Sequence, residues 1–368
     1  MKKRLPGPIR ILFAPLDWGL GHATRCIPLI RFFAEKGCTV WIAAEGRIEE
    51  LLQQEFPDLS FIPLRGYRIR YAGTKTGLVL KIMRQIPGIL QTIRYERQWL
   101  EQVIEQHHFD AVISDNRFGL STPSVPCVYL THQLSIQTPG GSLMEAWLRR
   151  LHYHYIDRFQ ACWIPDAKTA PNLSGKLAHP RRLPHTPVTY LGPLSRFIPG
   201  PEAPLTYELL ILLSGPEPQR TLFEEHLLRE LKTFDKKTLF VRGLPGDKKP
   251  LAGFNQVSIV NHLPASALNK AICHSHRVIA RTGYTTVMDL VRLEKKSILV
   301  PTPGQTEQEY LGKYLRSEGL AYTTSQRGFS LSRALEEAGR FRYRFPEGLS
   351  GEGYIKVAED FLTELLSR

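Results

Sequence analysis

Two glycines and a histidine near the N-terminus have the spacing of an anion-binding turn. They lie in the segment PLDWGLGHATR, at residues 15–25. Gly19 and Gly21 let the backbone turn tightly and approach a ligand, and the following helix start offers unpaired N–H groups. His22 at this position could donate a hydrogen bond to an anion or accept a proton. A strand-to-helix turn in which His22 or Thr24 caps the helix is the alternative.

The residue types exclude several common sites. The turn lacks the third glycine of G-x-G-x-x-G, and no Gly-Lys-Ser/Thr follows, so neither a Rossmann fingerprint nor a P-loop is present. The five cysteines are scattered and lack ligand spacing, and the chain has no Asp-x-Asp sequence. We therefore expect no disulfide framework, no metal and a reducing compartment.

A second glycine-bearing turn, ARTGYTTVMDL, occupies residues 280–290. Thr282, Gly283 and Thr286 open a predicted helix whose N-terminus could hold a phosphate. Asp289 lies two helical turns further on the same side, where a carboxylate could accept from paired ribose hydroxyls. A solvated aspartate on a helix face is the alternative.

A third segment, VPTPGQTEQEY at residues 300–310, ends a predicted strand and begins a helix. Thr306 and Glu309 have the spacing of a capping box, which gives both a structural explanation. Glu307 and Gln308 supply a carboxylate and an amide, which suit the vicinal hydroxyls of a sugar.

Polar residues also follow two predicted strands of the first half. Asp115 ends one strand, His132 follows another, and Asp17 precedes the first turn. Because strand ends of a doubly wound sheet face the ligand, these side chains could act on an acceptor hydroxyl, although turn or capping roles are the alternative. We predict His22 as the catalytic base, with Asp115 as the second candidate.

Strand-length apolar runs alternate with amphipathic helical segments, which predicts two doubly wound α/β domains. The segment 191–204, rich in proline and glycine, interrupts the alternation and is the expected linker. We expect an N-terminal domain at 1–195, a second domain at 205–345 and a C-terminal helix at 346–368 that packs toward the N-terminal domain. We predict that the helix after the first glycine-bearing turn begins at Ala23 and that the helix after the second begins at Thr285. A ligand would bind between the carboxyl ends of the sheets.

The chain has 368 residues and a formal net charge of +13, which favours anionic partners. Residues 65–97 hold eight Lys and Arg residues against the single acid Glu96, interleaved with apolar side chains. Such a surface could bind anionic lipid, or the helix could pack on its own sheet with solvated cations. No nucleic-acid motif accompanies these charges. Without a signal peptide or membrane span, we expect a cytoplasmic protein, peripheral on the inner face of the cell membrane.

The sequences GLGHATR, ARTGYTTVMDL and ILVPTPGQTEQEYLGKYL resemble glycosyltransferase family 28, a group with the GT-B fold. The resemblance implies transfer of a hexose from a nucleotide-diphosphate sugar to a hydroxyl acceptor that is lipid-linked or otherwise membrane-proximal, with no cofactor. It implies that the first turn faces the acceptor and the donor diphosphate, and that the second turn binds donor phosphate. Asp289 falls where the family has a ribose-binding glutamate. Glu307 and Gln308 match the stretch that holds the donor sugar.

Two further segments of the second domain resemble the family less closely. Ser214 and Gly215 open the domain where the family has a glycine-rich turn, but Pro216 and Pro218 remove N–H donors there. His262 and Leu263 match the family's nucleobase loop, whose backbone would read the base, with uridine the default. A sugar-nucleotide 2-epimerase and a non-catalytic nucleotide-sugar-binding module are the alternative functions.

Overall fold

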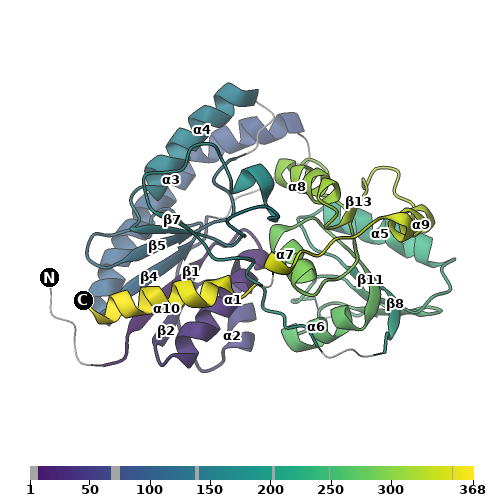
Figure 1. Ribbon diagram of the computed structural model, residues 1–368, viewed down its shortest axis with the longest axis horizontal. Coiled ribbons are helices and arrows are strands. Elements are labelled where there is room, and N and C mark those ends of the chain that lie inside the picture. Colours follow the sequence, from purple (N-terminus) through teal and green to yellow (C-terminus); the bar gives the residue numbers. More distant parts are fainter. Residues whose placement is uncertain (1–6, 68–74, 137–140, 201–203, 248, 350) are drawn as a thin grey trace. The chain divides into compact units, whose positions relative to one another are not determined.

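The computed structural model describes residues 7–67, 75–136, 141–200, 204–247, 249–349 and 351–368. The chain divides into two compact units, one formed by Met1–Leu194 with Ser350–Arg368 and the other by Ser195–Leu349. Each unit contains a parallel sheet with helices on both faces (Figure 1). The predicted fold class, two doubly wound α/β domains, is confirmed.

The first unit is built on a seven-stranded sheet with the order β3-β2-β1-β4-β5-β6-β7. Its elements are β1 (Arg10–Pro15), α1 (Leu20–Glu35), β2 (Thr39–Ala44), α2 (Arg47–Glu55), β3 (Ser60–Pro63), α3 (Lys75–His107), β4 (Ala111–Asp115), β5 (Cys127–Leu130), α4 (Gly141–Ile156), β6 (Ala161–Ile164), the short 3₁₀ helix Gly175–Leu177, β7 (Val188–Tyr190) and α10 (Gly353–Leu366). The strand order reverses between β1 and β4, which is the switch point where open α/β sheets bind ligands.

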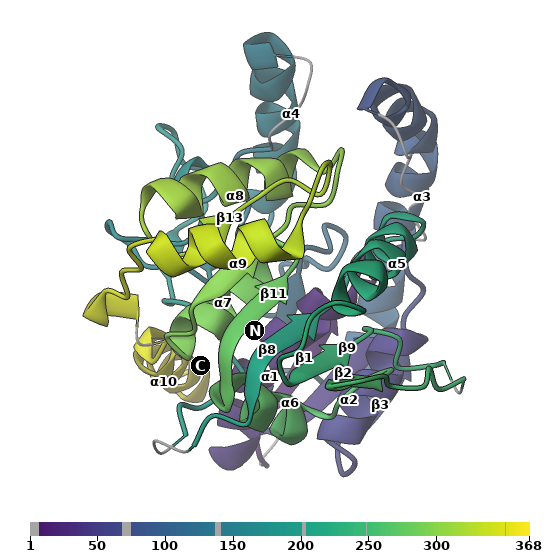
Figure 2. The same cartoon turned by 90° about the vertical axis from the view of Figure 1, so that its right-hand side faces the viewer.

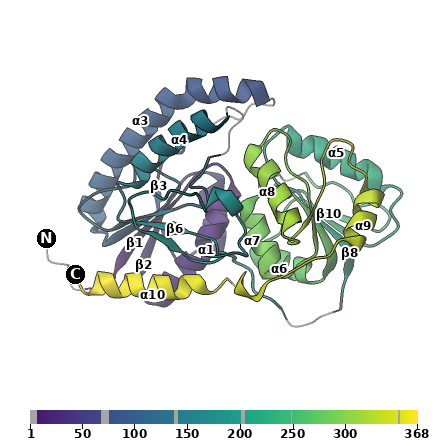
Figure 3. The ribbon, with the colours of Figure 1, turned by 45° about the horizontal axis from the view of Figure 1, so that its top comes forward.

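Helices cover both faces of this sheet (Figure 3). α3 and α4 lie on one face, and α1, α2 and α10 lie on the other. The C-terminal helix α10 contacts α1 and β7, and Phe361 packs its ring against Phe33 and Trp163. The last segment of the chain therefore completes the first unit.

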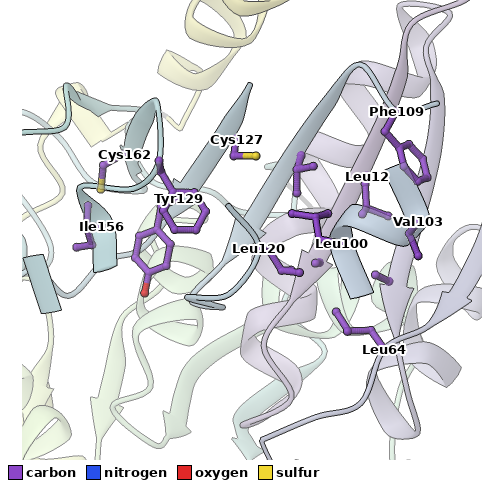
Figure 4. Packing of buried hydrophobic residues seen from close by; sticks show 14 of the residues in the cluster. Leu12, Leu64, Leu100, Val103, Phe109, Leu120, Cys127, Tyr129, Ile156 and Cys162 are labelled. Carbon is purple, nitrogen blue, oxygen red and sulfur yellow. The ribbon is translucent and has the colours of Figure 1, made fainter. Parts of the chain in front are cut away.

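One hydrophobic core cluster of the first unit lies between the sheet and α3 and α4 (Figure 4). Leu12 of β1 and Tyr129 of β5 are fully buried there with Leu100 of α3. Because both faces of the sheet are covered, the strands are almost continuously apolar. Cys127 belongs to the same core, and burial raises the pKa of its thiol to about 12. No cysteine in the described part of the chain forms a disulfide, and the core thiols are held in their unreactive protonated form.

The second unit is built on a six-stranded sheet with the order β10-β9-β8-β11-β12-β13. Its elements are β8 (Tyr207–Leu212), α5 (Gln219–Leu231), β9 (Thr238–Val241), β10 (Val257–Val260), α6 (Ala265–Cys273), β11 (Ser275–Ala280), α7 (Tyr284–Arg292), β12 (Ser297–Leu299), α8 (Thr306–Ser317), β13 (Tyr322–Thr323), α9 (Leu331–Arg340) and the 3₁₀ helix Glu347–Leu349. β8 and β11 lie side by side at the switch point of this sheet (Figure 2). α5 and α9 cover one face, and α6, α7 and α8 cover the other.

The structure differs from the sequence-based prediction in two details that bear on the site. α1 begins at Leu20, three residues before the predicted start, so Gly21 and His22 belong to its first turn. The half-buried edge strand β7 was not expected, because three residues are too short to give an alternation pattern. Among the helices of the described residues, none combines the length and the apolar character needed to cross a bilayer.

Candidate active site

Four polar side chains meet at the carboxyl edge of the first sheet. His22 and Arg25 come from the first turns of α1, Asp115 is the last residue of β4, and His132 follows β5. The strands β1, β4 and β5 are neighbours, so their carboxyl ends bring these residues together. We call this group the His22 cluster.

A buried ion pair forms the centre of the His22 cluster. Nε of Arg25 donates to Oδ2 of Asp115 at 2.8 Å, and Nη2 of Arg25 donates to Oδ1 of the same carboxylate. Arg25 is 1% exposed and Asp115 is fully buried. Burial alone would raise the pKa of Asp115, but the Arg25 charge and the hydrogen bonds to the carboxylate hold it well below its ordinary value. Asp115 is therefore ionised and paired with Arg25. This makes it a weak base, but its carboxylate can accept a hydrogen bond from His22.

His22 lies against this ion pair with its side chain 17% exposed. Its Nδ1 is 3.2 Å from Oδ1 of Asp115 and 3.0 Å from Nη2 of Arg25. Because a carboxylate only accepts and a guanidinium only donates, Nδ1 either donates to Asp115 or accepts from Arg25. The tautomer with the proton on Nδ1 pairs His22 with Asp115 and leaves Nε2 with its lone pair. Burial lowers the pKa of His22 against the opposing attraction of Asp115, so the imidazole is neutral at pH 7.

The start of α1 has no side-chain cap. Its N-cap residue is Gly19, and neither His22 nor Thr24 caps the helix. Thr24 instead donates to the carbonyl of Gly21 at 3.2 Å. Gly19 has φ 155° and ψ 159°, a conformation that is accessible essentially to glycine alone. The capping interpretation of His22 and Thr24 is therefore wrong, and Gly19 sets the direction from which α1 begins.

The structure separates the other two polar residues that were predicted near this edge. Nη1 of Arg25 donates to Nδ1 of His132 at 2.7 Å, so His132 belongs to the His22 cluster. Asp17 instead accepts from the backbone N–H of Tyr67 at 3.0 Å. Gly66 packs so closely that an added Cβ would lie 2.2 Å from a carboxylate oxygen of Asp17. Asp17 thus joins the first turn to the segment that follows β3.

The second sheet presents a different group of polar residues at its carboxyl edge. Thr282 follows β11, Thr302 follows β12, and Gly215 follows β8, which are three adjacent strands. Thr282 is fully buried and Thr302 is 1% exposed, yet neither hydroxyl has a hydrogen-bond partner among the described residues. A Cβ on Gly215 would lie 3.5 Å from the Thr302 hydroxyl. Unpaired buried hydroxyls are costly, so a pair of them is typical of a surface that binds a polar ligand.

Arg281 adds a buried positive charge next to Thr282. It is 1% exposed and packs over the ring of Phe223 at 4.5 Å. Its Nη2 donates to the carbonyl of Gln219 at 2.9 Å, but its Nε has no partner, and no carboxylate of the described residues pairs with it. Burial lowers the pKa of Arg281 to about 10, so the guanidinium remains charged at pH 7.

Asp289 lies in α7, on the same unit. It is 7% exposed, so the alternative of a solvated aspartate is wrong. The hydroxyl of Ser195 donates to Oδ1 of Asp289 at 2.7 Å. Burial raises the pKa of Asp289 to about 6, while the charge of Arg196 and the Ser195 hydrogen bond oppose the rise. The charge of Arg196 also acts with burial to lower the pKa of His262, the half-buried residue of the predicted nucleobase loop.

The turn before α8 is held by its own side chains. Gln308 accepts from the backbone N–H of Thr302 at 2.9 Å through Oε1, and its Nε2 donates to Gln305. Glu309 accepts from the N–H of Gly304 at 3.1 Å. The N-cap is Gln305, without a side-chain cap, so the predicted capping box of Thr306 and Glu309 is wrong. The amide of Gln308 therefore fixes the position of Thr302.

The remaining predicted residues occupy the expected segments. Thr286 and Glu307 are partly exposed in the first turns of α7 and α8, Leu263 is half-buried before α6, and Ser214 and Gly215 are exposed after β8. Gly283 is the N-cap of α7, where an added Cβ would meet only the Thr286 hydroxyl, at 3.8 Å. The described residues contain no group of His, Cys, Asp or Glu side chains that could hold a metal ion.

Sequence reasoning missed Arg25, Arg281, Thr302 and Ser195. Arg25 had a signal, because it follows His22 by three residues on the same helix and residues so spaced are neighbours. Arg281 stands beside Thr282 within a segment that was already singled out. Ser195 lies in the expected linker, where a serine carries no pattern of its own.

Residues 247–343 match the model of the Glycosyltransferase family 28 C-terminal domain. This segment contains the second turn, Asp289 and the turn before α8. No curated protein sequence matches the chain.

Several solved structures share the fold along the whole chain. SnogD, a glycosyltransferase from Streptomyces nogalater, is 14% identical with a TM-score of 0.61, covering 98% of this chain and 100% of its own. MurG of Acinetobacter baumannii is 13% identical with a TM-score of 0.54, covering 98% and 100%. SsfS6, a glycosyltransferase of Streptomyces sp. SF2575 complexed with thymidine diphosphate, is 15% identical with a TM-score of 0.59, covering 98% and 96%. The GT-B fold expected from the resemblance is confirmed.

Proposed function

We propose that this chain, which has the GT-B fold and matches the family 28 C-terminal domain over residues 247–343, is a glycosyltransferase. It transfers a hexose from a nucleotide-diphosphate sugar to a hydroxyl acceptor. The observation that carries the proposal is the His22 cluster, in which a partly exposed neutral imidazole is backed by an ionised carboxylate at a switch point. This arrangement is suited to removing a proton from a hydroxyl group.

The first unit supplies the base in the proposed reaction. The acceptor hydroxyl gives its proton to Nε2 of His22 while its oxygen forms a bond to the anomeric carbon of the donor sugar. The bond from that carbon to the diphosphate breaks, and the diphosphate leaves with the electron pair. Asp115 orients His22 and stabilises the imidazolium, and Arg25 fixes Asp115. Catalysis by a positioned base contributes about 10²–10⁴ in rate.

The second unit supplies the donor site. The hydroxyls of Thr282 and Thr302 and the N-terminus of α7 would hydrogen-bond the diphosphate, and the charge of Arg281 would stabilise it as it leaves. Asp289 would accept from the ribose, and Glu307 would contact the sugar. The segment at His262 and Leu263 would read the base through its backbone. The thymidine diphosphate in the SsfS6 structure supports a nucleoside-diphosphate donor for this fold.

The proposal also specifies the acceptor, which is lipid-linked or otherwise membrane-proximal. Arg65, Arg94 and Arg97 are exposed, and Tyr95, which follows Arg94 in the chain, is 37% exposed. Residues 68–74 and the side chains of 75–86 in the same stretch lie outside the described residues. Sedimentation with anionic liposomes should detect binding that weakens at high salt, because charges near such a surface contribute about 1 kcal/mol each. Equal binding to neutral liposomes would contradict this part.

A thermal-shift screen with nucleoside diphosphates and their sugars tests donor binding. A ligand at 100 times its Kd should stabilise the protein by about 2.7 kcal/mol. The donor that binds is then incubated with a lipid extract, and mass spectrometry should detect glycosylated lipid together with released nucleoside diphosphate.

Two outcomes favour the alternative functions. An epimerised donor formed without any acceptor would identify a sugar-nucleotide 2-epimerase. Tight donor binding with neither transfer nor hydrolysis, over a panel of acceptors, would identify a non-catalytic nucleotide-sugar-binding module.

A further inference from the structure

A chain of hydrogen-bonded charged and polar side chains runs along the carboxyl edge of β8, β9 and β10 in the second unit. These strands are neighbours in the sheet, and Leu213, Arg242 and Asn261 are the residues that directly follow them. The backbones stay paired there, because the N–H of Leu213 donates to Val241 and the N–H of Arg242 donates to Val260, both at 2.9 Å. The side chains that follow the three strands therefore lie at neighbouring positions.

Glu224 of α5 joins two arginines at this edge. Arg220 donates to its Oε2 at 2.6 Å, and Arg242 donates to its Oε1 at 2.9 Å. Glu224 and Arg220 are buried, and the side chain of Arg242 is 13% exposed. Nε of Arg220 also donates to Glu217, in the proline-bearing loop after β8, at 2.6 Å. The carboxylate of Glu224 thus fixes Arg242 against α5 and, through Arg220, links it to that loop.

Arg242 also contacts Asn261, which directly precedes His262 and Leu263 of the predicted nucleobase loop. Nη1 of Arg242 donates to Oδ1 of Asn261 at 2.8 Å. Because a guanidinium only donates, this contact determines which end of the Asn261 amide carries the oxygen. The amide nitrogen then points the other way, where it donates to two backbone carbonyls of residues 247–249, at 2.7 and 3.0 Å.

The backbone of Asn261 is held at the same point. Its carbonyl accepts from the N–H of Leu244 at 2.8 Å, in the turn that follows β9. Gly243 in that turn has φ 72°, and an added Cβ would lie 2.2 Å from the carbonyl oxygen of Leu213. The turn after β9 therefore packs closely on the end of β8. Residues 262 and 263 leave Asn261 in a direction that this turn and Arg242 together determine.

A loop that reads a nucleobase through its backbone needs a fixed conformation. The bases differ in the order of hydrogen-bond donors and acceptors along their edges. A backbone N–H or carbonyl distinguishes them only when it is held close to one position, because a movable loop can turn a suitable group toward each base. Base discrimination therefore depends on the residues that hold the loop as well as on the loop itself.

We propose that Arg242 is a positioning residue for base specificity, which orients Asn261 and so holds the backbone of residues 262 and 263 in the conformation that accepts the preferred base. The inference rests on the proposed function, because it requires that a nucleotide donor binds at this edge. Arg242 acts through Asn261 and does not contact the ligand. Arg242 and its anchor Glu224 both lie outside residues 247–343, the segment that matches the family model.

Isothermal titration of the full-length protein with UDP, CDP, GDP, ADP and dTDP tests the inference. The measured quantity is the ratio of the Kd for the second-best nucleotide to the Kd for the best one. In Arg242→Ala, Glu224 keeps Arg220 as a partner, and this ratio should fall by about fivefold, the value of one hydrogen bond. A merely structural role would weaken the binding of all five nucleotides alike and leave the ratio unchanged.

Variants of Asn261 test whether Arg242 acts through it. Asn261→Ala should lower the ratio as much as Arg242→Ala does, and the double variant should lower it no further, because both changes break the same connection. Arg333→Ala is the matched control. It removes a guanidinium that donates to Glu337 on α9 at 2.7 Å, and it should leave the ratio unchanged.

The other outcomes overturn the inference in different ways. An unchanged ratio in Arg242→Ala, at a melting temperature close to that of the wild type, removes the role of Arg242. If that variant does not fold, an unchanged ratio in Asn261→Ala has the same meaning. A double variant whose effect is the product of the two single effects excludes action through Asn261. A wild-type protein that binds all five nucleotides within about threefold overturns base reading but keeps the donor class. If none of the five binds, the proposed function fails as well.

Discussion

At the carboxyl edge of the first sheet, Arg25 donates to Asp115 and to His132, and Asp115 lies beside His22. At the carboxyl edge of the second sheet, the hydroxyls of Thr282 and Thr302 are buried, and neither has a hydrogen-bond partner in the described part of the chain. The two sheets have the same doubly wound construction, so the difference lies in the side chains that their strand ends present.

Among the described residues, the polar side chains are paired with one another at the first edge, whereas two hydroxyls at the second are unpaired, and this difference fits the different roles proposed for the two edges. In the first unit the hydrogen bonds of the protein fix the orientation of His22, which is the arrangement that the proposed acid–base catalysis needs. In the second unit the proposed donor would offset the free-energy cost of the hydroxyls that have no partner among the described residues. We therefore expect mutations at the first edge to affect turnover and stability, and those at the second edge to affect ligand binding.

The largest expected effect is on turnover in His22→Ala. Loss of the base should slow transfer by at least about a hundredfold, while the melting temperature and nucleotide affinity stay close to the wild-type values. Release of nucleoside diphosphate in the presence of acceptor measures the rate. His154→Ala, at an exposed histidine of α4, is the matched control. A loss below about threefold would leave His22 without a catalytic role.

The next effect is on stability in Asp115→Ala. This variant removes the carboxylate that neutralises the buried guanidinium of Arg25, which should lower the free energy of unfolding by about 3–5 kcal/mol. Urea unfolding followed by circular dichroism measures the change. A double variant, Arg25→Met with Asp115→Leu, removes both charges and should recover part of the loss. A double variant less stable than Asp115→Ala would mean that the ion pair is not the source of the effect.

The pKa of Asp289 predicts a pH-dependent nucleotide affinity. Burial raises this pKa from 3.8 to about 6 against the charge of Arg196, so the carboxyl is mostly protonated at pH 5 and mostly ionised at pH 7. An ionised carboxylate is the better acceptor, so affinity should rise with pH across this window, by up to about tenfold. Titrations at several pH values measure the change, and Asp289→Asn should flatten it. An equal rise in Asp289→Asn would contradict the assignment.

The raised pKa of Asp289 gives the folding stability a pH dependence opposite to that of the nucleotide affinity. A raised pKa means that the folded chain binds the proton more tightly than the unfolded chain between pH 3.8 and about 6. The stability contributed by Asp289 is therefore greatest below pH 3.8 and falls as the pH rises to about 6. Comparison of wild type with Asp289→Asn at each pH isolates this contribution.

The smallest expected effects are those of Thr302→Val on stability and on donor affinity, and they distinguish the roles of the two sheet edges most clearly. Thr302→Val removes a buried hydroxyl that no described residue pairs with, so stability should be unchanged or slightly higher. Donor affinity should fall by about fivefold, because one hydrogen bond to the ligand is lost. Calorimetric titration and thermal melting measure the two quantities. A large loss of stability would mean that the hydroxyl is satisfied within the fold.

The helices and strands were largely predictable because both sheets are parallel and covered on both faces. Buried strands of this kind are short apolar runs, such as β1 and β4, and amphipathic helices separate them. The start of α1 was placed three residues late, because Leu20 and Gly21 carry no helix signal and Gly19 has no capping side chain. The capping box at Thr306 failed because Glu309 binds the N–H of Gly304 instead.

The site was predictable where a residue's role depends on its position along a strand or a turn. Asp115 ends its strand, and His22 and His132 come after strands that neighbour it in the sheet, so the alternation of the sequence was enough to expect all three at one edge. Arg25 was not predicted, because an arginine on a helix is usually solvated. Its burial depends on Asp115, which lies 90 residues further along the chain.

The sequence by itself determined the parallel α/β class, the turns at residues 15–25, 280–290 and 300–310, and the polar residues at the strand ends, because these follow from local periodicity and from glycine, proline and charge. Only the tertiary structure decided which of those residues pair with each other. Asp115 becomes a fixed partner for His22 because Arg25 holds it. Asp289 has a raised pKa because the fold buries it, while the Ser195 hydrogen bond and the charge of Arg196 oppose that rise. Ionisation and hydrogen bonding depend on neighbours in space, and these neighbours come from segments far apart in the chain.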